Sequence, residues 1–238
     1  MKILAIECSA TACSAAILED EKVIASGYVN VKLTHSQTLM PMIEQLFKSS
    51  MTEFDGIEGF AVSEGPGSFT GIRIGISAVK GMAAPKNLPC VGVSTLRAMA
   101  ENYSDSDCIV CAVMDARCNQ VYNALFDISG GKITRLCEDR ALMCDELAEN
   151  LKNMSQKEKK SVIIVGDGAE IFYPYVKELD NVSISASHRR YQNAVGVGMA
   201  AIVEFKNNLC KNPEELLPVY LRLPQAEREL KLKKEQGK

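Results

Sequence analysis

The first part of the chain alternates short apolar runs with polar turns. Apolar or alternating runs cover Lys2–Glu7, Cys13–Leu18 and Val23–Val31. Short runs of this kind, separated by turn residues, predict three strands joined as a hairpin meander. Farther along, apolar residues recur at helical spacing and predict a helix over residues 36–49. The apolar stripe of this helix is formed by Leu39, Met42, Ile43 and Leu46.

The chain then alternates between strand and helix patterns. Gly59–Ser63 is a short apolar run, and a glycine-rich segment follows it. A helical pattern covers residues 70–84 and stops at Pro85, because proline does not fit a helix interior. Val91–Val93 predicts another strand, and a serine cap predicts a helix over residues 94–102. This order is typical of an α/β lobe with parallel strands.

A polar stretch, Tyr103–Asp107, separates this part from a second series of the same kind. Its strand patterns are Cys108–Met114, Val121–Asp127, Lys132–Leu136 and Val162–Val165, and its helical patterns are Asp145–Lys152, a segment from Glu170, and Asn193–Asn207. The sequence therefore predicts an α/β fold of two lobes, residues 1–103 and 104–225, although no repeat of fixed period is present. The charged residues 226–238 predict a frayed tail.

Composition and charge narrow the class of protein. The 238 residues include 27 Lys+Arg and 30 Asp+Glu, for a formal net charge of −3. Proteins that coat nucleic acid carry a clear basic excess, so a role on RNA would need another protein to hold the RNA. The nine cysteines and the lack of a signal-peptide pattern after Met1 favour the reducing cytoplasm. No apolar run reaches the roughly 18–20 residues of a membrane span.

Chemistry that depends on paired histidines or paired CxxC motifs is absent from the sequence. His35 and His188 lie far apart, so no metal site built on two histidines is expected. His35 stands at a helix start, where a capping or interface role is expected. Cys108 and Cys111 have CxxC spacing, but they lie inside a strand pattern and no second CxxC follows, which indicates core cysteines.

The glycine-rich segment from Glu64 to Gly71 is the most distinctive pattern. It matches neither GxxxxGK[ST] nor GxGxxG. One interpretation is an anion cradle, in which glycines turn the backbone and a helix N-terminus offers free N–H groups. Such a loop would use Gly65, Gly67, Ser68 and Thr70, with Arg73 adding a charge. The alternative is close packing, since Gly71, Gly75 and Ala78 share one helical face. Spacing alone leaves both interpretations open.

An acidic residue ends the first strand of each predicted lobe. Glu7, followed by Ser9, stands where actin-like ATPases place an acid and a phosphate loop near Mg²⁺, and Asp115 stands in the equivalent place before Arg117. One acid after one strand is a weak signal, and a structural salt link at a hairpin is the alternative for Asp115. The loop Gly166–Gly168 could contact a nucleotide or be a simple turn.

Several segments, in order from residue 1 to about 222, together carry a resemblance to one family. They are Met1–Ser9, Cys13–Ala16, His35–Gln37 with Leu39–Pro41, Gly65–Gly75, Gly92–Thr95, Asp115–Arg117 with Val121–Tyr122, and Pro218–Arg222. The block GPGSFTGIRIG is the most specific of them. The sequence resembles the bacterial TsaB (YeaZ) family, which is needed to make threonylcarbamoyladenosine in tRNA.

The resemblance implies an actin/Hsp70-like (ASKHA) fold of two lobes, each a mixed sheet with flanking helices. It implies a non-catalytic, activating subunit that binds the paralogue TsaD, the enzyme that transfers a threonylcarbamoyl group to the adenosine beside the anticodon. The ATPase TsaE would join the complex, and tRNA would be reached only through it. Alone, the chain would form a homodimer. No cofactor or metal of its own is implied, and ATP or ADP would be held only at the complex interface.

The resemblance also places the binding surface on the first two helices, roughly residues 36–49 and 70–84. The residues expected to bind the partner are Leu39, Met42, Ile43, Leu46, Gly71, Arg73, Gly75 and Ala78. A vestigial nucleotide or anion loop would comprise Glu7, Ser9, Gly65, Gly67, Ser68 and Thr70. Family members commonly have Asp-Thr where this chain has Glu7-Cys8, which argues against independent ATP binding. The alternative function is a stand-alone ASKHA-type phosphotransferase or ATPase, motivated by the Gly65–Gly71 loop with its nearby acids.

Overall fold

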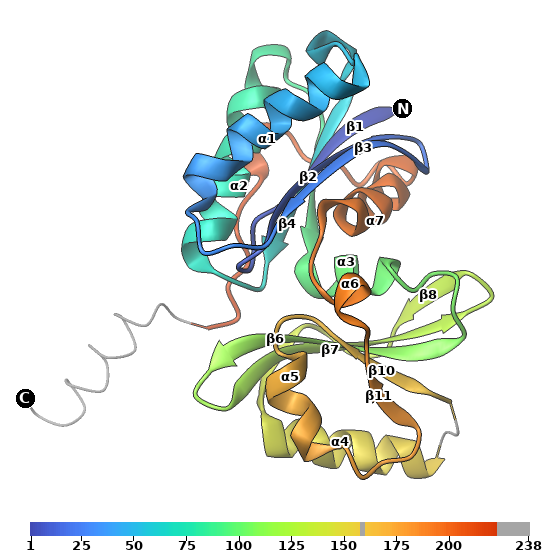
Figure 1. Cartoon of the computed structure of the whole chain (residues 1–238). Helices are drawn as coiled ribbons and strands as arrows, with labels where there is room; N and C mark the ends of the chain where they lie inside the picture. The colour runs from blue at the N-terminus through green and yellow to red at the C-terminus, as the bar shows by residue number, and fades with distance from the viewer. Residues whose placement is uncertain (158–159, 223–238) are drawn as a thin grey trace, which may run out of the picture.

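The computed structural model describes residues 1–157 and 160–222, which form two lobes (Figure 1). The first lobe is built on a five-stranded sheet of order β3-β2-β1-β4-β5. Its strands are β1 (Lys2–Glu7), β2 (Cys13–Glu19), β3 (Lys22–Val29), β4 (Gly59–Gly65) and β5 (Cys90–Ser94). The first three strands are antiparallel neighbours, as the meander pattern predicts, and β1, β4 and β5 are parallel.

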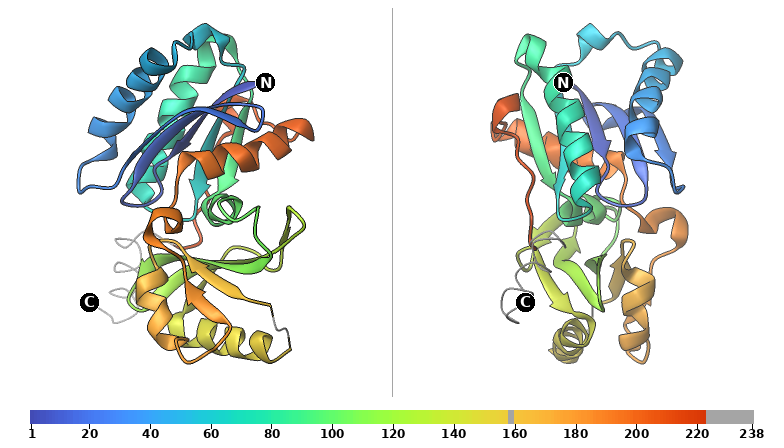
Figure 2. Two further views of the ribbon diagram at one scale, coloured as in Figure 1. Left: turned by 45° about the vertical axis from the view of Figure 1, so that its right-hand side comes forward. Right: turned by 90° about the vertical axis from the view of Figure 1, so that its left-hand side faces the viewer.

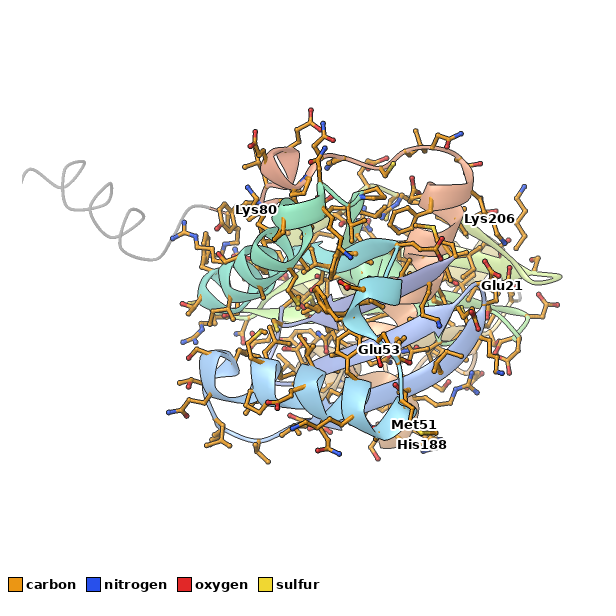
Figure 3. The ribbon with its side chains drawn as sticks, turned by 90° about the horizontal axis from the view of Figure 1, so that it is seen from above. Glu21, Met51, Glu53, Lys80, His188 and Lys206 are labelled. Atoms are coloured by element: carbon orange, nitrogen blue, oxygen red, sulfur yellow. The ribbon has the colours of Figure 1, made fainter. Side chains whose placement is uncertain are left out.

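Helices cover both faces of the first sheet. One face carries α1 (His35–Ser50) and α2 (Phe69–Ala83), which lie side by side when the molecule is seen from above (Figure 3). The other face carries α7 (Ala194–Lys206), whose alanines and valines pack on β1, β2 and β4. The approach of α7 is close, because a Cβ at Gly198 would collide with the Leu18 side chain.

The second sheet has the order β11-β10-β6-β7-β8, and β9 also pairs with β7. Its strands are β6 (Cys108–Arg117), β7 (Gln120–Ser129), β8 (Lys132–Arg135), β9 (Arg140–Met143), β10 (Val162–Val165) and β11 (Val182–Ile184). One face packs on α4 (Cys144–Lys157) and α5 (Ala169–Phe172), and the other on α3 (Thr95–Glu101). The sequence patterns did not predict β9, β11 or α6 (Ser187–Arg190), which are three or four residues long.

The predicted boundary between the lobes is wrong for two helices. The sequence places α7 in the second lobe, but α7 packs on the first sheet. It places α3 in the first lobe, but α3 packs on the second sheet. The two helices also pack against each other between the lobes. The chain therefore crosses between the lobes more than once, and a cut near residue 104 does not separate two independent cores. The predicted tail, residues 226–238, lies outside the described residues.

The segment after α7 contacts both lobes. Lys211 pairs with Cys90 at the edge of the first sheet, and the Val219 N–H donates to the Glu64 carbonyl at 2.7 Å. The chain then descends to the second lobe (Figure 2), where the Arg222 guanidinium donates to the Ala116 carbonyl. Residues 217–222 are called the strap below.

Cys108 and Cys111, which have CxxC spacing, lie in different hydrophobic cores. Cys108 belongs to the core on the α3 side of β6, whereas Cys111 belongs to the core on the α4 and α5 side. Since the two side chains point to opposite faces of the sheet, they are separate core cysteines, as predicted. Over residues 1–157 and 160–222, no helix combines the length and the apolar character that a membrane crossing requires.

Candidate functional site: the cleft and the outer face of α2

The glycine-rich loop lets the start of α2 pack directly on the β1–β2 hairpin. Ser68 caps the helix by accepting a hydrogen bond from the Gly71 N–H at 3.3 Å, and its own N–H donates to the Ser9 carbonyl at 2.6 Å. A Cβ at Gly67 would collide with the Ser9 carbonyl oxygen, and one at Gly71 with that of Cys8. The glycines thus serve a close approach of two backbone segments.

These contacts favour the packing interpretation of the loop. An anion cradle needs free N–H groups and open space at the helix N-terminus. Here the N–H groups of Ser68 and Gly71 already have acceptors, and the Cys8 carbonyl oxygen faces Gly71. The N–H groups of Ser68 and Gly71 are therefore not free to bind a phosphate group, and the packing interpretation accounts for Gly67 and Gly71. Gly65 serves in the same way, since its φ of +128° leaves no room for a Cβ beside the Val219 carbonyl.

Glu7 lies at the end of β1 as predicted, but it is completely buried. Burial raises the pKa of its carboxyl to about 7. The Ser9 N–H donates to its Oε1 at 2.5 Å and opposes that shift. Hydrogen bonding from the buried Ser9 and Ser63 hydroxyls opposes the same shift in pKa. Glu7 is thus a buried carboxyl group beneath the hairpin, and it keeps its proton until the pH is near neutral.

Two other acids stand at strand ends in the second lobe. Asp115 is exposed and accepts a hydrogen bond from the Arg117 N–H at 2.7 Å. Asp167, in the loop after β10, has its pKa raised to about 6 by burial, although Gln192 donates to its Oδ1 at 2.7 Å. Asp167 also interacts electrostatically with Glu7 and with Asp115. The fold therefore brings the predicted acids of both lobes toward one region, and it adds Asp167 to them.

That region is a cleft of about 520 Å³ between the lobes. Its polar lining residues are Ser9, Thr11, Lys32, His35, Ser68, Asp115, Arg117, Tyr122 and Asp167. Cations and carboxylates both line it, so it suits a polar ligand of mixed charge. His35 begins α1, with its Nε2 3.3 Å from the Ala12 carbonyl. Within the described part of the chain, no group of three or more His, Cys, Asp or Glu side chains is placed to hold a metal ion.

The residues predicted to bind a partner occupy two different environments. Leu39, Ile43 and Leu46 are at most 6% exposed and lie in the core between α1 and the sheet. Gly71 and Gly75 face Cys8 and Val62 and are likewise buried. The prediction is wrong for these five positions, because the stripe and the glycine face pack on the chain's own sheet.

The remaining predicted positions lie nearer the surface. Met42 and Ala78 are half-buried against the same core, and Arg73 is exposed on α2. Thr70, which is predicted to belong to the anion loop, is also exposed there. A shallow groove of about 440 Å³ follows the outer face of α2. It is lined by Phe69, Thr70, Arg73, Ile74 and Ser77, and these five residues are called the α2 face below.

The strap supports one end of the α2 face. The Tyr220 ring stacks on Phe69 with centroids 4.4 Å apart. Arg73 donates from Nε to the Tyr220 hydroxyl at 2.7 Å, and its guanidinium lies 5.5 Å from the ring centroid. Sequence reasoning did not select Tyr220 as a site residue. The sequence did offer one signal for Tyr220, the Pro218–Arg222 motif. Its residues follow neither a helical nor a strand period, which indicates that Tyr220 is in the motif for a tertiary contact.

Two lobes of mixed sheets with flanking helices, meeting at a polar cleft, define an actin/Hsp70-like (ASKHA) protein. The (R)-2-hydroxyglutaryl-CoA dehydratase component A of Acidaminococcus fermentans shares this fold at a TM-score of 0.50, with 13% identity, over 86% of this chain and 98% of that one. The family model "TsaD: tRNA N6-adenosine threonylcarbamoyltransferase" matches residues 30–230.

Relatives at higher identity define the branch of this family. The tRNA threonylcarbamoyladenosine biosynthesis protein TsaB of Escherichia coli is 30% identical, covering 88% of this chain and 96% of its own. The TsaB protein of Bacillus subtilis is 28% identical, covering 95% and 96%. The structure of YeaZ from Pseudomonas aeruginosa matches with a TM-score of 0.79 and 26% identity, covering 92% and 99%. The chain belongs to the TsaB (YeaZ) branch of the TsaD family.

Proposed function

We propose that this chain acts in the biosynthesis of threonylcarbamoyladenosine in tRNA as a non-catalytic, activating subunit. It binds a TsaD-type transferase, the TsaE ATPase joins the assembly, and tRNA is reached only through the complex. The names of its TsaB relatives and the TsaD-family match support this assignment. The chain needs no cofactor of its own in this role, and ATP or ADP is held at the complex interface.

The observation that carries the proposal is the α2 face. Ile74 is only half-buried there, Arg73 is exposed, and the Phe69–Tyr220 stack fixes one end of the surface. A rigid helix face with an aromatic and an arginine is a composition typical of protein interfaces. The same face would pair two copies of the chain when the transferase is absent. Substitutions at Leu39 or Gly75 would test the core and not this surface, because both residues are buried.

The test is a reconstitution of tRNA modification with a surface variant and a matched control. Ser77→Arg places a long charged side chain at the C-terminal end of the α2 face, where Ser77 is exposed. Asn153→Arg adds the same side chain to the exposed face of α4 in the second lobe. Each protein is combined with TsaD, TsaE, tRNA, ATP and threonylcarbamoyl-adenylate, and modified nucleoside is measured by mass spectrometry.

We expect Ser77→Arg to reduce both co-elution with TsaD and modification at least tenfold, and Asn153→Arg to match the unaltered chain. If modification does not depend on the chain at all, the assignment of the role is wrong. If it depends on the chain but tolerates Ser77→Arg, the role stands and the surface is wrong.

A stand-alone ATPase is the second candidate, and the acids at the cleft favour it. Asp115 and Asp167 line the cleft with Lys32 and Arg117, and such groups could hold Mg²⁺ and phosphate oxygens. Isothermal titration of the isolated chain with ATP and Mg²⁺ tests this candidate. Micromolar binding with turnover would support it, and the absence of heat at high protein concentration would exclude it.

A further inference from the structure

Two buried cysteines face each other at the turn of the first hairpin. The β1–β2 register pairs Glu7 with Ser14, so the next opposed positions are Cys8 and Cys13, on either side of the loop 9–12. Their sulfur atoms lie 3.9 Å apart, and both residues are nearly inaccessible to solvent, at 0% and 3% exposed. Opposed residues of an antiparallel pair have Cα atoms about 4.5–5.5 Å apart, which lies within the span of about 4.4–6.8 Å that a disulfide bridges.

The contact between the two thiols shifts their pKa values in opposite directions. The hydrogen bond with Cys8 lowers the pKa of Cys13, and Thr38 adds to that effect. The same contact, together with burial, raises the pKa of Cys8. Because the thiolate is the reactive form of cysteine and Cys13 is the more accessible residue of the two, at 3% against 0% exposed, we take Cys13 as the nucleophile of the pair and Cys8 as its protonated partner.

We propose that Cys8 and Cys13 form a reversible dithiol–disulfide site that responds to hydrogen peroxide. The Cys13 thiolate attacks one peroxide oxygen, the O–O bond breaks, and hydroxide leaves, which gives a sulfenic acid on Cys13. The Cys8 sulfur then attacks the Cys13 sulfur. The S–O bond breaks and water leaves with the Cys8 proton. In total, two thiols and one peroxide give one disulfide and two waters.

The oxidant must be small because both sulfurs are enclosed. The hairpin residues next to the pair, Ser9, Ala10 and Thr11, line the cleft, which brings solvent to within a few residues of Cys13. A bulky disulfide such as oxidised glutathione has no comparable access. The exposed thiols Cys118 and Cys210 provide the contrast, since they would react with either oxidant.

Disulfide formation would also change the contact between the hairpin and α2. The sulfurs must move from 3.9 Å to about 2 Å apart. The Cys8 carbonyl packs against Gly71, and the Cys8 Cβ lies near Gly75. A shift of Cys8 is therefore passed to the helix that carries the α2 face. This consequence concerns the proposed function, whereas the redox site itself does not depend on it.

The test uses the full chain with Cys118→Ser and Cys210→Ser, so that no exposed thiol consumes peroxide. The folded protein is treated with a slight excess of hydrogen peroxide, its remaining thiols are alkylated in denaturant, and its peptides are mapped by mass spectrometry. We expect most molecules to carry a Cys8–Cys13 cross-link that dithiothreitol reverses, and oxidised glutathione to give none. Adding Cys8→Ser should leave a sulfenic acid on Cys13 that dimedone captures.

Three outcomes would overturn the proposal. One is an unreacted pair in protein that circular dichroism shows to be folded. Another is a cross-link of either cysteine to Cys90 or another thiol. The last is a Cys8–Cys13 cross-link that forms only in urea, which would mean that the folded pair is closed to oxidants. None of these outcomes depends on tRNA modification, so this test and the reconstitution can fail independently.

Discussion

The hairpins that open the two lobes occupy equivalent places but have opposite environments. In the first lobe, Glu7 and Ser9 are fully buried under the start of α2. In the second lobe, Asp115 is exposed at the cleft, and the turn beyond it is also exposed. That turn contains three consecutive residues with φ between 55° and 64°, namely Arg117, Cys118 and Asn119.

The difference arises from what packs on each strand end. Gly67 and Gly71 let α2, a helix of 15 residues, rest on the first hairpin. In the second lobe, Gly166 and Gly168 bring their loop against the backbone of β6, but the helix that follows, α5, has only four residues. Glycines before a helix thus serve close packing in both lobes. Only the longer helix closes its hairpin, and so only the first acid loses contact with water.

The largest effect is expected where the glycine contact of the first hairpin is removed. Gly71→Ala would drive a methyl group into the Cys8 carbonyl, and backbone on both sides must move. We expect a loss of about 3 kcal/mol in the free energy of unfolding, at the upper end of overpacking costs. Gly81→Ala is the matched control on the same helix. Open space surrounds Gly81, so its substitution should gain about 0.5–1 kcal/mol.

Urea denaturation of both variants measures these changes. If Gly71→Ala is as stable as Gly81→Ala, the hairpin and α2 are not in backbone contact. The burial of Glu7 would then need a cause other than the contact with α2.

The buried acid of the first hairpin predicts a pH effect of intermediate size. Folding raises the pKa of Glu7 to about 7, so folded protein keeps a proton that the unfolded chain loses near pH 4.5. The free energy of unfolding therefore falls as the pH rises from 4.5 to about 7, by up to about 1.4 kcal/mol per pH unit. Glu7→Gln stays neutral and still offers an oxygen to the Ser9 N–H.

The stability of Glu7→Gln relative to the unaltered chain should rise by about 2 kcal/mol between pH 5 and pH 8. Chemical denaturation at several pH values measures this difference. Glu53→Gln, at an exposed position labelled in Figure 3, should show no such trend. Parallel pH profiles for Glu7→Gln and the unaltered chain would mean that Glu7 is charged in the folded state.

The sequence predicted the elements of both hairpins better than their environments. Strand and helix patterns are local, so β1, β2, α1 and α2 lie where the spacing of apolar residues places them. The spacing of Leu39, Ile43 and Leu46 shows that one helix face is apolar, but a face buried in the core and a face that binds a partner have the same pattern. Whether that face is buried in the core depends on the sheet, which is assembled from distant segments of the chain.

Contacts that join remote parts of the chain could not be predicted from local patterns at all. The Phe69–Tyr220 stack and the packing of α7 on the first sheet depend on how the chain returns to the first lobe. The Cys8–Cys13 pair is different. The strands Lys2–Glu7 and Cys13–Leu18 were predicted with a short turn between them, and their hairpin register already places the two cysteines opposite each other.

The smallest expected effect comes from the exposed hairpin of the second lobe. Cys118 has a φ of 55°, a conformation that is costly for residues with a Cβ and nearly free for glycine. Since Cys118 is exposed, Cys118→Gly should remove this cost without leaving a cavity and raise the free energy of unfolding by about 0.5 kcal/mol. Cys210→Gly is the control, because Cys210 is also exposed but has no positive φ, and it should lower stability slightly. Thermal melts of both variants measure the difference. Equal losses would show that the turn does not hold its left-handed geometry in solution, and that the second hairpin differs from the first in order as well as in burial.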